Sequence, residues 1–471
     1  MDKQVSGMHP AQASPSVEAF ASARALLESS LLHIDGRPVG TIASLDPRVP
    51  AENYRDCFVR DFVSSALVFL LEGRPEIVRN FLDLILRLRG QQDELHGQQR
   101  APGVLPASFK IVETLDGSHE VSADFGDRAI GRVAPVDSMM WWVLLLRAYT
   151  RATGDATFSR TPECQRGLRQ ILNLCLQSRF EVFPTLLVPD GSFMIDRRMG
   201  VDGHPLEIQA LFHATLRAAR ELLIDEEASR WLIELASRRE DVLRDYVREY
   251  YWLDMDALNR IHRYDTELFG HGIENALNIY PDSIPPWVPD WLPDDAGYLV
   301  GNLGPGHMDF RFFAQGNLLA AMFGLSSAGQ SRALLRLFDL RWEDLIGTLP
   351  LKIVFPAVEG EAWRLITGCD PKNTPWSYHN GGNWPTLLWP FVAACLQHDR
   401  ADLAQRAVRL IEARVARDDW PEYYDGRRGR LIGRKANRRQ IWSASAFILA
   451  RHLLDDPACL QRLGFGEEPR T

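Results

Sequence analysis

Residues 75–90 read PEIVRNFLDLILRLRG, and this segment carries the pattern that decides the fold. Its apolar side chains recur every three or four positions, the spacing that places them on one face of an α-helix. They are Ile77, Phe81, Ile85 and Leu88. Pro75 suits the first turn of a helix, and Gly90 is a typical stop. The segment is therefore predicted to form an amphipathic helix.

The same helical spacing recurs along the chain, and Ser331 is the expected N-cap of one such helix. The helical segments come in pairs joined by short connections. The pairs are 55–72 with 75–89, 136–152 with 157–178, 205–223 with 226–251, and 384–398 with 400–416. Alternation over strand length is scarce, and its best example lies near 349–355. The repeating unit is helix, loop, helix, with strands as a minor component.

Long segments rich in Gly, Pro, Asp and Trp separate these helices. They are 119–137, 181–204, 281–310, 367–384 and 418–439. Loops longer than about 12–15 residues in a compact domain are usually functional. We therefore expect an all-α fold of the (α/α)-barrel type, a toroid of helical hairpins with long loops and minor β structure at one end. A linear solenoid would show units of a fixed period, which this sequence lacks.

Composition excludes several classes of protein. The 471 residues include 53 basic and 62 acidic side chains, a net charge of −9, which argues against nucleic acid as a partner. The longest apolar run, 139–146, is too short to cross a membrane. No secretory signal is visible, so a cytoplasmic protein is expected. We expect residues 1–15 to be a flexible N-terminus and 16–471 to form one domain.

Motifs for metal and cofactor chemistry are missing from the sequence. It has no phosphate-binding loop, no nucleophile elbow and no HExxH pair. The twelve histidines show no ligand spacing with cysteines or carboxylates, and the six cysteines form no CxxC pair. We therefore expect no metal, no other cofactor, and reduced cysteines.

Acidic, aromatic and amide residues gather in the long loops, a composition that suits carbohydrate binding. Hydrolysis of a glycosidic bond requires two carboxyl groups, one on either side of that bond. The candidate carboxyls are Asp61, Asp137, Asp190, Asp196, Asp202, Asp309 and Glu422. Each has a structural alternative, because a loop aspartate is more often a capping or turn residue. Asp61 and Asp309 also lie close to arginines, with which structural ion pairs are the alternative.

Seven blocks of the sequence closely resemble the alkaline/neutral invertases. They are ADFG at 123–126, GRVAPVDS at 131–138, MIDRRMG at 194–200, GHPLEIQAL at 203–211, HMDFRFF at 307–313, DPKNTPWSYHNGG at 370–382 and WPEYYD at 420–425. The resemblance runs in order from about Asn53 to Leu449. It implies an (α/α)6 barrel that hydrolyses sucrose with inversion, in the cytoplasm, without a metal, as a homo-oligomer.

The resemblance also implies catalytic roles. Asp196 of the DRRM motif matches the general acid, and Glu422 of the PEYY motif matches the general base. The acid must keep a proton for the leaving oxygen, whereas adjacent cations would favour its ionised form. Arg197 and Arg198 are therefore expected to point toward substrate hydroxyls or other carboxylates. The reserve candidates for the acid are Asp190 and Asp202.

Further residues are expected to bind the sugar. Those expected to contact hydroxyl groups are Arg60, Asp61, Asp137, Arg198, His204, Gln209, Asp309, Arg311, His379 and Asn380, and those expected to stack on a ring are Trp141, Trp376 and Trp384. One of Trp141 and Trp142 is expected to lie in the core instead. Residues 379–382 have an alternative as a helix-entry turn, whose glycines permit close backbone approach.

One block departs from the family pattern. Residues 433–436 read GRKA, where such proteins commonly carry Gly-Lys-Gln-Ala, and the whole stretch 427–439 is basic. We interpret this stretch as a solvated or subunit-contact face, with the hypothesis that its positive potential favours an ionised Glu422.

Together with this resemblance, the sequence predicts an inverting β-fructofuranosidase that acts on sucrose by a single displacement. It leaves open which anomeric carbon is attacked, although inverting (α/α) barrels usually act on glucosyl C1. Inversion predicts carboxyl groups about 6.5–9.5 Å apart. Two alternatives stay open. One is an (α/α)-barrel glycosidase acting on trehalose or short α-glucans, and the other is a catalytically silent sugar-binding scaffold.

Overall fold

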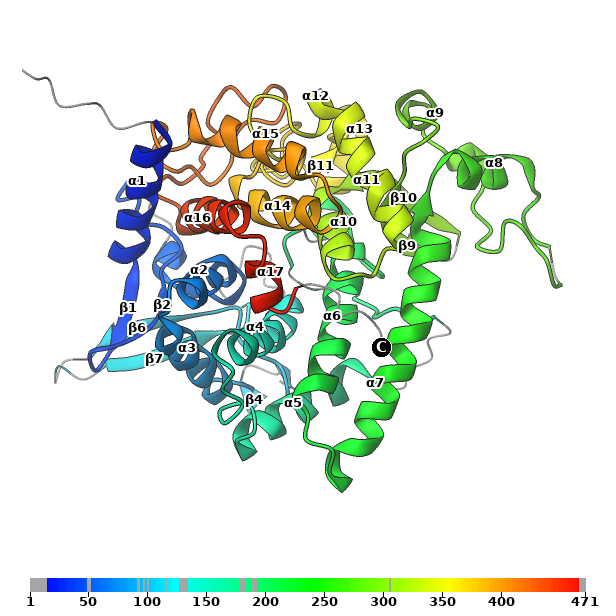
Figure 1. Ribbon diagram of the computed structural model, residues 1–471. Coiled ribbons are helices and arrows are strands. Elements are labelled where there is room, and N and C mark those ends of the chain that lie inside the picture. Colours follow the sequence, from blue (N-terminus) through cyan, green and yellow to red (C-terminus); the bar gives the residue numbers. More distant parts are fainter. Residues whose placement is uncertain are drawn as a thin grey trace, which may run out of the picture.

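The computed structural model describes most of the chain. The described residues are 15–48, 52–90, 94–95, 98–99, 101–114, 117, 119–126, 134–177, 183–188, 191, 193–195, 197–268, 270–304 and 306–465. The prediction of a mainly helical chain is confirmed (Figure 1). The expected flexible N-terminus lies, apart from Pro15, outside these residues.

Six helices contact one another in a closed cycle. In order they are α2 (Val59–Leu71), α4 (Asp137–Thr153), α6 (Leu206–Leu222), α10 (Ala314–Met322), α14 (Leu388–Gln397) and α16 (Ile441–Asp455), which returns to α2. They are apolar and buried almost all round, as enclosed helices must be. In α4, for example, every residue from Asp137 to Leu146 is buried.

A second set of helices covers this inner ring. They are α1 (Pro15–Ser29) on α16, α3 (Pro75–Arg87) on α2 and α4, α5 (Pro162–Cys175) and α7 (Glu227–Tyr246) on α6, α11 (Ala328–Leu340) on α10, and α15 (Ala401–Glu412) on α14 and α16. The outer helix α3 buries one stripe that includes the predicted Ile77, Phe81 and Ile85. The four predicted helix pairs are confirmed.

The boundary of one helix differs from its prediction. Helix α11 is capped by Ser327, whose hydroxyl accepts from the Gln330 N–H while the Gln330 side chain returns to the Ser327 N–H. The predicted cap, Ser331, is buried inside the helix, and its hydroxyl lies 2.8 Å from that of Ser326. The prediction of Ser331 as the cap was therefore wrong, because the capping box begins four residues earlier.

A four-stranded antiparallel sheet occupies part of a predicted loop. Its order is β11 (Val354–Phe355), β10 (His307–Phe313), β9 (Tyr298–Gly304) and β8 (Trp252–Leu253). Strand β9 is buried along nearly its whole length, so it lacks the apolar and polar alternation of a half-exposed strand. Of the strand expected near 349–355, Val354–Phe355 pairs with β10, and Lys352 forms an isolated antiparallel bridge with Asn383.

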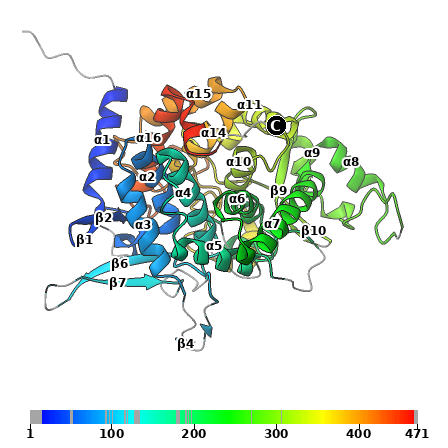
Figure 2. The ribbon, with the colours of Figure 1, turned by 60° about the horizontal axis from the view of Figure 1, so that its bottom comes forward.

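The remaining elements are short. The strands are β1 (Leu31–Ile34) paired with β2 (Arg37–Thr41), β4 (Glu94–Leu95) paired with β5 (Gln98–Gln99), and a sheet of β3 (Cys57–Phe58), β6 (Ser108–Glu113) and β7 (His119–Asp124). The helices and helical turns are η1 (Glu52–Arg55), η2 (Arg197–Met199), η3 (Val247–Tyr251), α8 (Met255–Arg263), η4 (Pro281–Ser283), α9 (Trp287–Trp291), α12 (Trp342–Leu345), α13 (Gly360–Thr367), η5 (Pro385–Leu387) and α17 (Cys459–Arg462). Figure 2 shows the β6–β7 hairpin extending beyond the helices.

Apolar side chains from α1 through α17 form one continuous buried cluster. Among the helices of the described ranges, none combines the length and the apolar character that crossing a membrane requires.

Candidate active site

The first turns of the inner helices meet at one end of the ring, around a cavity of about 20 Å³. Its lining comes from α2, α4, α10, η5, α14 and α16, together with one loop residue. The lining residues are Arg60, Val63, Ser64, Trp141, Met194, Gln315, Thr386, Trp389 and Trp442. Helix N-termini carry partial positive charge and favour carboxylates. This end of the ring is therefore suited to hold several acidic groups.

A buried ion pair joins the starts of α2 and α4. The Arg60 Nε atom lies 2.5 Å from Asp137 Oδ2, and the Asp137 side chain is fully buried. Burial alone would lower the pKa of Arg60, but the Asp137 carboxylate raises it above its ordinary value. Arg60 also donates to the Phe193 carbonyl at 3.1 Å. The pair therefore holds the segment that leads to Asp196.

Glu207 at the start of α6 holds the same segment from the other side. Its Oε1 atom accepts a hydrogen bond from the Met194 N–H at 3.0 Å. Burial raises the pKa of Glu207 to about 8, with Arg60 opposing this rise and Asp137 adding to it. Glu207 is thus a buried carboxyl that keeps its proton near neutral pH. Glu207 stands in the block GHPLEIQAL at 203–211, which could have pointed to it. It was not among the site residues predicted from the sequence.

The pKa of Glu207 predicts how stability depends on pH. The folded protein holds a proton that the unfolded chain, with a glutamate pKa near 4.5, releases, so this group makes stability fall as pH rises from about 4.5 to about 8. Replacing Glu207 by Gln keeps a neutral acceptor and should flatten that fall, which denaturant unfolding at pH 5 to 9 would measure. The exposed Glu361→Gln variant is the control. Parallel pH curves for wild type and Glu207→Gln would contradict the prediction.

Asp61 is a second carboxyl group whose pKa is raised. Burial raises its pKa to about 7, Arg60 opposes this, and the carboxylates of Glu422 and Asp137 raise it further. The charges of Asp61 and Glu422 therefore interact. The structure brings together Arg60, Asp61, Asp137 and Glu422 among the residues that the sequence singled out.

Glu422 is buried, with 2% of its surface exposed. Its segment is tied to the first turn of α16, where the Ser443 hydroxyl donates to the Pro421 carbonyl at 2.9 Å. The Tyr54 hydroxyl donates to Glu422 Oε1 at 2.9 Å, and the backbone and side-chain N–H groups of Asn437 donate to Oε2 at 3.4 Å each. All three partners are donors, and a carboxylate accepts all of them without needing a proton of its own.

Two arginines hold the turn that follows Asp196. Arg311 pairs with Asp309 at 2.5 Å and donates to the Met199 carbonyl at 2.8 Å. Arg198 lies 3.8 Å from the Asp370 carboxylate. Asp309 therefore forms the ion pair with Arg311 that was given as its structural alternative.

The acid candidates themselves are placed as follows. Asp196 and Asp190 lie outside the described residues, as does the side chain of Arg197. Asp202 is exposed, and its carbonyl accepts from the Asn302 side chain at 2.6 Å. The separation of the two carboxyl groups predicted to be catalytic, those of Asp196 and Glu422, therefore stays a prediction.

Several predicted sugar-binding side chains bond to other parts of the protein. Gln209 accepts from the Leu186 N–H at 2.8 Å and donates to its carbonyl at 2.9 Å, and Asn380 pairs in the same way with Val358 at 2.7 and 2.9 Å. The others are Trp384, whose indole donates to the Tyr378 carbonyl at 3.0 Å, Trp376, which donates to Glu359 at 2.7 Å, and His204, whose Nδ1 lies 2.8 Å from the Thr185 hydroxyl. These contacts hold the loops in shape.

Other buried polar atoms remain available. Within the described part of the chain, the indole N–H groups of Trp141 and Trp442 and the Nδ1 atom of His379 are buried without a hydrogen-bond partner. Both tryptophans line the cavity. A buried unpaired polar group costs about 1–3 kcal/mol, which a hydroxyl group of a ligand would offset. Trp442 was missed in the sequence.

Two sequence-based interpretations of this region are confirmed. Trp142 donates to the Leu82 carbonyl at 3.0 Å, so it is the core member of the tryptophan pair. At Gly382 a Cβ atom would lie 2.6 Å from the Tyr378 carbonyl oxygen, so a side chain there would clash with the backbone. The glycine thus permits the close approach that brings this loop against Tyr423.

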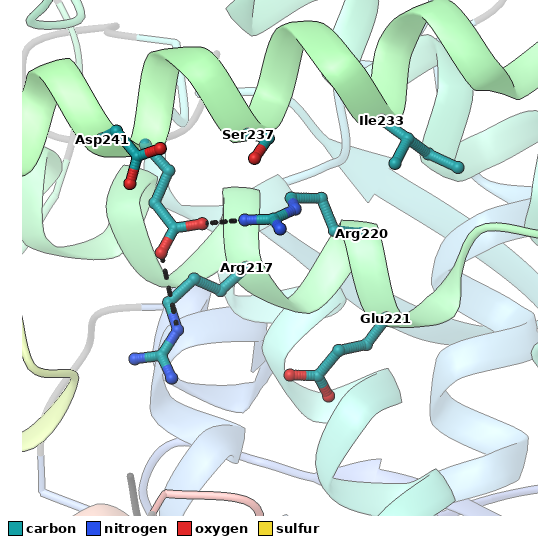
Figure 3. A pocket seen from close by; sticks show the side chains of 7 residues that line it. Arg217, Arg220, Glu221, Ile233, Ser237 and Asp241 are labelled. Carbon is teal, nitrogen blue, oxygen red and sulfur yellow. Dashed lines mark hydrogen bonds and ion pairs between the residues drawn. The ribbon is translucent and has the colours of Figure 1, made fainter. Parts of the chain in front are cut away.

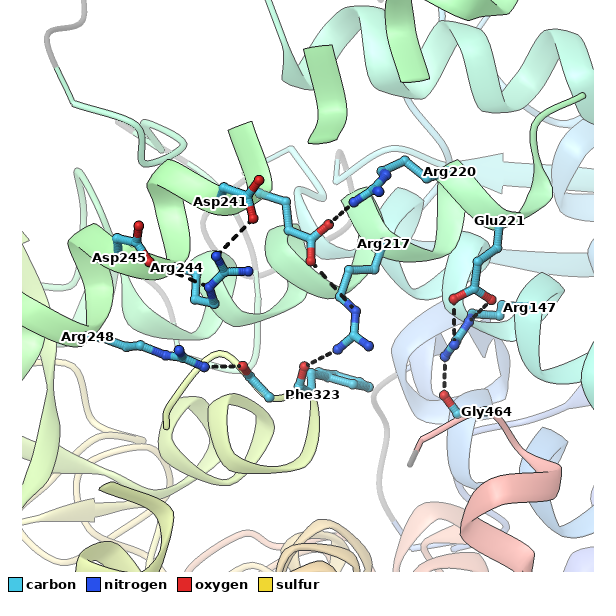
Figure 4. A network of polar contacts seen from close by, with 12 residues as sticks. Arg147, Arg217, Arg220, Glu221, Asp241, Arg244, Asp245, Arg248, Phe323 and Gly464 are labelled. Atoms are coloured by element: carbon cyan, nitrogen blue, oxygen red, sulfur yellow. Dashed lines mark hydrogen bonds and ion pairs between the residues drawn. The ribbon is translucent and has the colours of Figure 1, made fainter. Parts of the chain in front are cut away.

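A larger hollow of about 450 Å³ lies outside the ring, between α6 and α7 (Figure 3). The buried Glu240 pairs there with Arg220 and lies 3.8 Å from Arg217. Figure 4 shows a neighbouring pair, in which Arg147 lies 2.7 Å from Glu221. These arginines and carboxylates are paired with one another, so the hollow is the surface of a structural network.

Comparison with known sequences gives a consistent result. The family model described as alkaline and neutral invertase matches residues 23–457. The alkaline/neutral invertase CINV2 of Arabidopsis thaliana is 49% identical over 450 residues, covering 95% of this chain and 81% of that protein. The cytosolic invertase 1 of Oryza sativa subsp. japonica is 49% identical, covering 94% and 79%. A relative from the same plant named neutral/alkaline invertase 1, mitochondrial, is 50% identical, covering 92% and 70%.

Solved structures resemble the fold at low sequence identity. A rhamnosidase from Klebsiella oxytoca with rhamnose bound has a TM-score of 0.53 and 15% identity, covering 95% of this chain and 66% of that one. A bacterial glucoamylase complexed with acarbose has a TM-score of 0.52 and 11% identity, covering 94% and 57%. A wild-type glycosidase has a TM-score of 0.55 and 14% identity, covering 98% and 100%. The chain therefore has a helix-rich fold of a kind found in glycosidases.

Proposed function

Because the chain belongs to the alkaline and neutral invertase family, we propose that it hydrolyses sucrose to glucose and fructose, the overall reaction of a β-fructofuranosidase. The observation that carries this proposal is the buried Glu422, whose carboxyl oxygens accept hydrogen bonds from Tyr54 and Asn437 at one end of the helix ring. A carboxylate held in this way is equipped to take a proton from water.

The architecture is proposed to be an (α/α)6 barrel forming a single catalytic domain over residues 16–471. The closed cycle of six inner helices and the outer helices that cover it support this proposal. Converging first turns and the loops before them then form the active end.

The mechanism is proposed to be a single displacement with inversion. Glu422 removes a proton from the attacking water, and Asp196 gives a proton to the leaving oxygen. Two observations support Asp196: Arg60 and Glu207 hold the residues that precede it, and Arg311 holds Met199 after it.

Sugar recognition is proposed to involve the unpaired buried groups. Trp141 and Trp442 would donate from their indoles, and His379 would contact a hydroxyl in its neutral form. Burial, and then the charges of Arg198, Lys372 and Arg60, lower the pKa of His379 well below its ordinary value. A neutral imidazole can donate from one nitrogen and accept at the other, as a hydroxyl requires.

The cellular setting is proposed from relatives. The relatives named above include a cytosolic and a mitochondrial invertase, and we propose the cytoplasm for this chain, as a homo-oligomer. Tagged protein in fractionated cells and light scattering of the purified protein would test these two points.

Product analysis tests the proposed reaction. In water labelled with ¹⁸O, sucrose should yield labelled glucose, and NMR should detect β-glucose before mutarotation, because inversion at glucosyl C1 converts the α linkage. First release of α-glucose would contradict inversion, and labelled fructose would move the attack to the fructosyl carbon. Turnover of trehalose or maltose but not sucrose would favour the other glycosidase, and no turnover would favour the silent scaffold.

A further inference from the structure

Lys372 has no role in the proposed catalytic mechanism, yet it is connected to Glu422 through Tyr54. The Lys372 Nζ atom donates to the Tyr54 hydroxyl oxygen at 3.3 Å, and the Tyr54 hydroxyl donates to Glu422 Oε1 at 2.9 Å. An ammonium group only donates, and a tyrosine hydroxyl has a single proton. The direction of both bonds is therefore fixed, from Lys372 through Tyr54 to Glu422.

Lys372 is also held in place by aromatic rings. Its Nζ atom lies 3.8 Å from the centre of the Tyr378 ring and 5.9 Å from that of Tyr54. Burial alone would lower the pKa of Lys372, but the charge of Glu422, followed by Tyr378, raises it above its ordinary value. Lys372 is thus a partly buried cation whose charge interacts with the Glu422 carboxylate.

Within the described residues, four other groups whose charges interact with that of Glu422 are acidic or phenolic side chains. They are Asp61 on α2, Tyr54 on η1, Tyr378 on the 370–382 loop and Tyr423 next to it. From the basic stretch 427–439, it is the uncharged Asn437 that bonds to Glu422. Arg434 and Lys435 of that stretch are exposed. The hypothesis about the basic stretch stays a hypothesis, and Lys372 is a second source of positive charge near Glu422.

We propose that Lys372 is a positioning residue for hydrolysis, acting through the Tyr54 hydroxyl to hold the Glu422 carboxylate in one orientation beside a positive charge. The proposal rests on the proposed role of Glu422 as general base. An aliphatic side chain of similar length would fill the same space without the desolvation penalty of a charge. A role in packing alone therefore does not explain a lysine here.

The pH profile of kcat/KM tests the proposal. In Lys372→Met the acidic limb, which reports the base, should move to higher pH by about 1 to 3 units, because an opposite charge nearby has this effect on a carboxyl pKa. Lys372→Arg keeps the charge and should keep the limb near its wild-type position. Lys352 is a matched control, since it is also buried, donates to the Gly426 carbonyl and lies 4.9 Å from the Trp376 ring. Lys352→Met should leave the limb unchanged.

A double-mutant cycle tests the route through Tyr54. If Lys372 acts through that hydroxyl, Lys372→Met combined with Tyr54→Phe should be no worse than the worse single variant. Near-ultraviolet circular dichroism checks that each variant is folded. If Lys372→Met does not fold, Tyr54→Phe alone decides, because loss of the relay should move its limb in the same direction.

The proposal is overturned if the acidic limb of the pH profile does not move in folded Lys372→Met. If that variant does not fold, an unmoved limb in Tyr54→Phe has the same meaning. Additive losses of kcat/KM in the double-mutant cycle would also overturn it. Failure of the proposed function looks different, because Glu422→Gln would then retain near-normal turnover. If Glu422→Gln is inactive while Lys372→Met keeps the wild-type profile, only the role of Lys372 is wrong.

Discussion

Replacing Glu422 by Gln should lower kcat on sucrose by about 10²- to 10⁴-fold, the range that general acid–base groups contribute. The amide cannot take a proton from water. It also turns an NH₂ group toward Tyr54 or Asn437, both of which donate to the carboxylate in the wild type. The KM for sucrose should change far less than kcat, since Glu422 acts on water.

Steady-state kinetics with Glu240→Gln as the matched control would measure this effect. Glu240 is also buried, but it pairs with Arg220 between α6 and α7, outside the ring, so its replacement should spare turnover. Glu422→Ala with azide and α-glucosyl fluoride adds a second measurement, because azide in the vacated space should yield β-glucosyl azide. Turnover of Glu422→Gln within a few-fold of wild type would remove Glu422 from the mechanism.

The helices were predictable because burial leaves a periodic trace in sequence. Outer helices such as α3 bury one stripe, so Ile77, Phe81 and Ile85 recur with helical spacing. Strand β9 left no such trace, because almost all of its side chains are buried and an apolar run of this length suits several structures. The first residue of a helix is also hard to predict from sequence. For α11 the predicted N-cap was Ser331, whereas the structure has Ser327.

The site was predictable only where chemistry is local. Glu422 and Asp137 stand in blocks that resemble a known family, but the bond from Tyr54 to Glu422 joins residues 368 positions apart. No spacing rule reaches that far, so Tyr54 and Lys372 were missed. The arginines were expected at the sugar, whereas Arg60 and Arg311 donate to backbone carbonyls on either side of Asp196. Partial burial favours such backbone contacts, and the burial of an arginine is not visible in sequence.

Replacing Asp196 by Asn is the second change with a large expected effect. Sucrose hydrolysis should fall by about 10²- to 10⁴-fold, because the leaving fructosyl oxygen needs a proton that an amide cannot give. Folding should stay near normal, since Arg60, Glu207 and Arg311 hold the flanking residues through their backbones and do not require the Asp196 side chain.

The leaving group separates a lost acid from a lost binding contact. Fluoride departs without full protonation, so Asp196→Asn should hydrolyse α-glucosyl fluoride much closer to the wild-type rate than sucrose, whereas Glu422→Gln should be impaired on both. Asp202→Asn is the control, because Asp202 is an exposed neighbour and the reserve candidate. If Asp196→Asn loses both substrates equally, Asp196 does not act as the acid. If Asp202→Asn instead shows the selective loss on sucrose, the acid is Asp202, and the ring of helices presents a different carboxyl opposite Glu422.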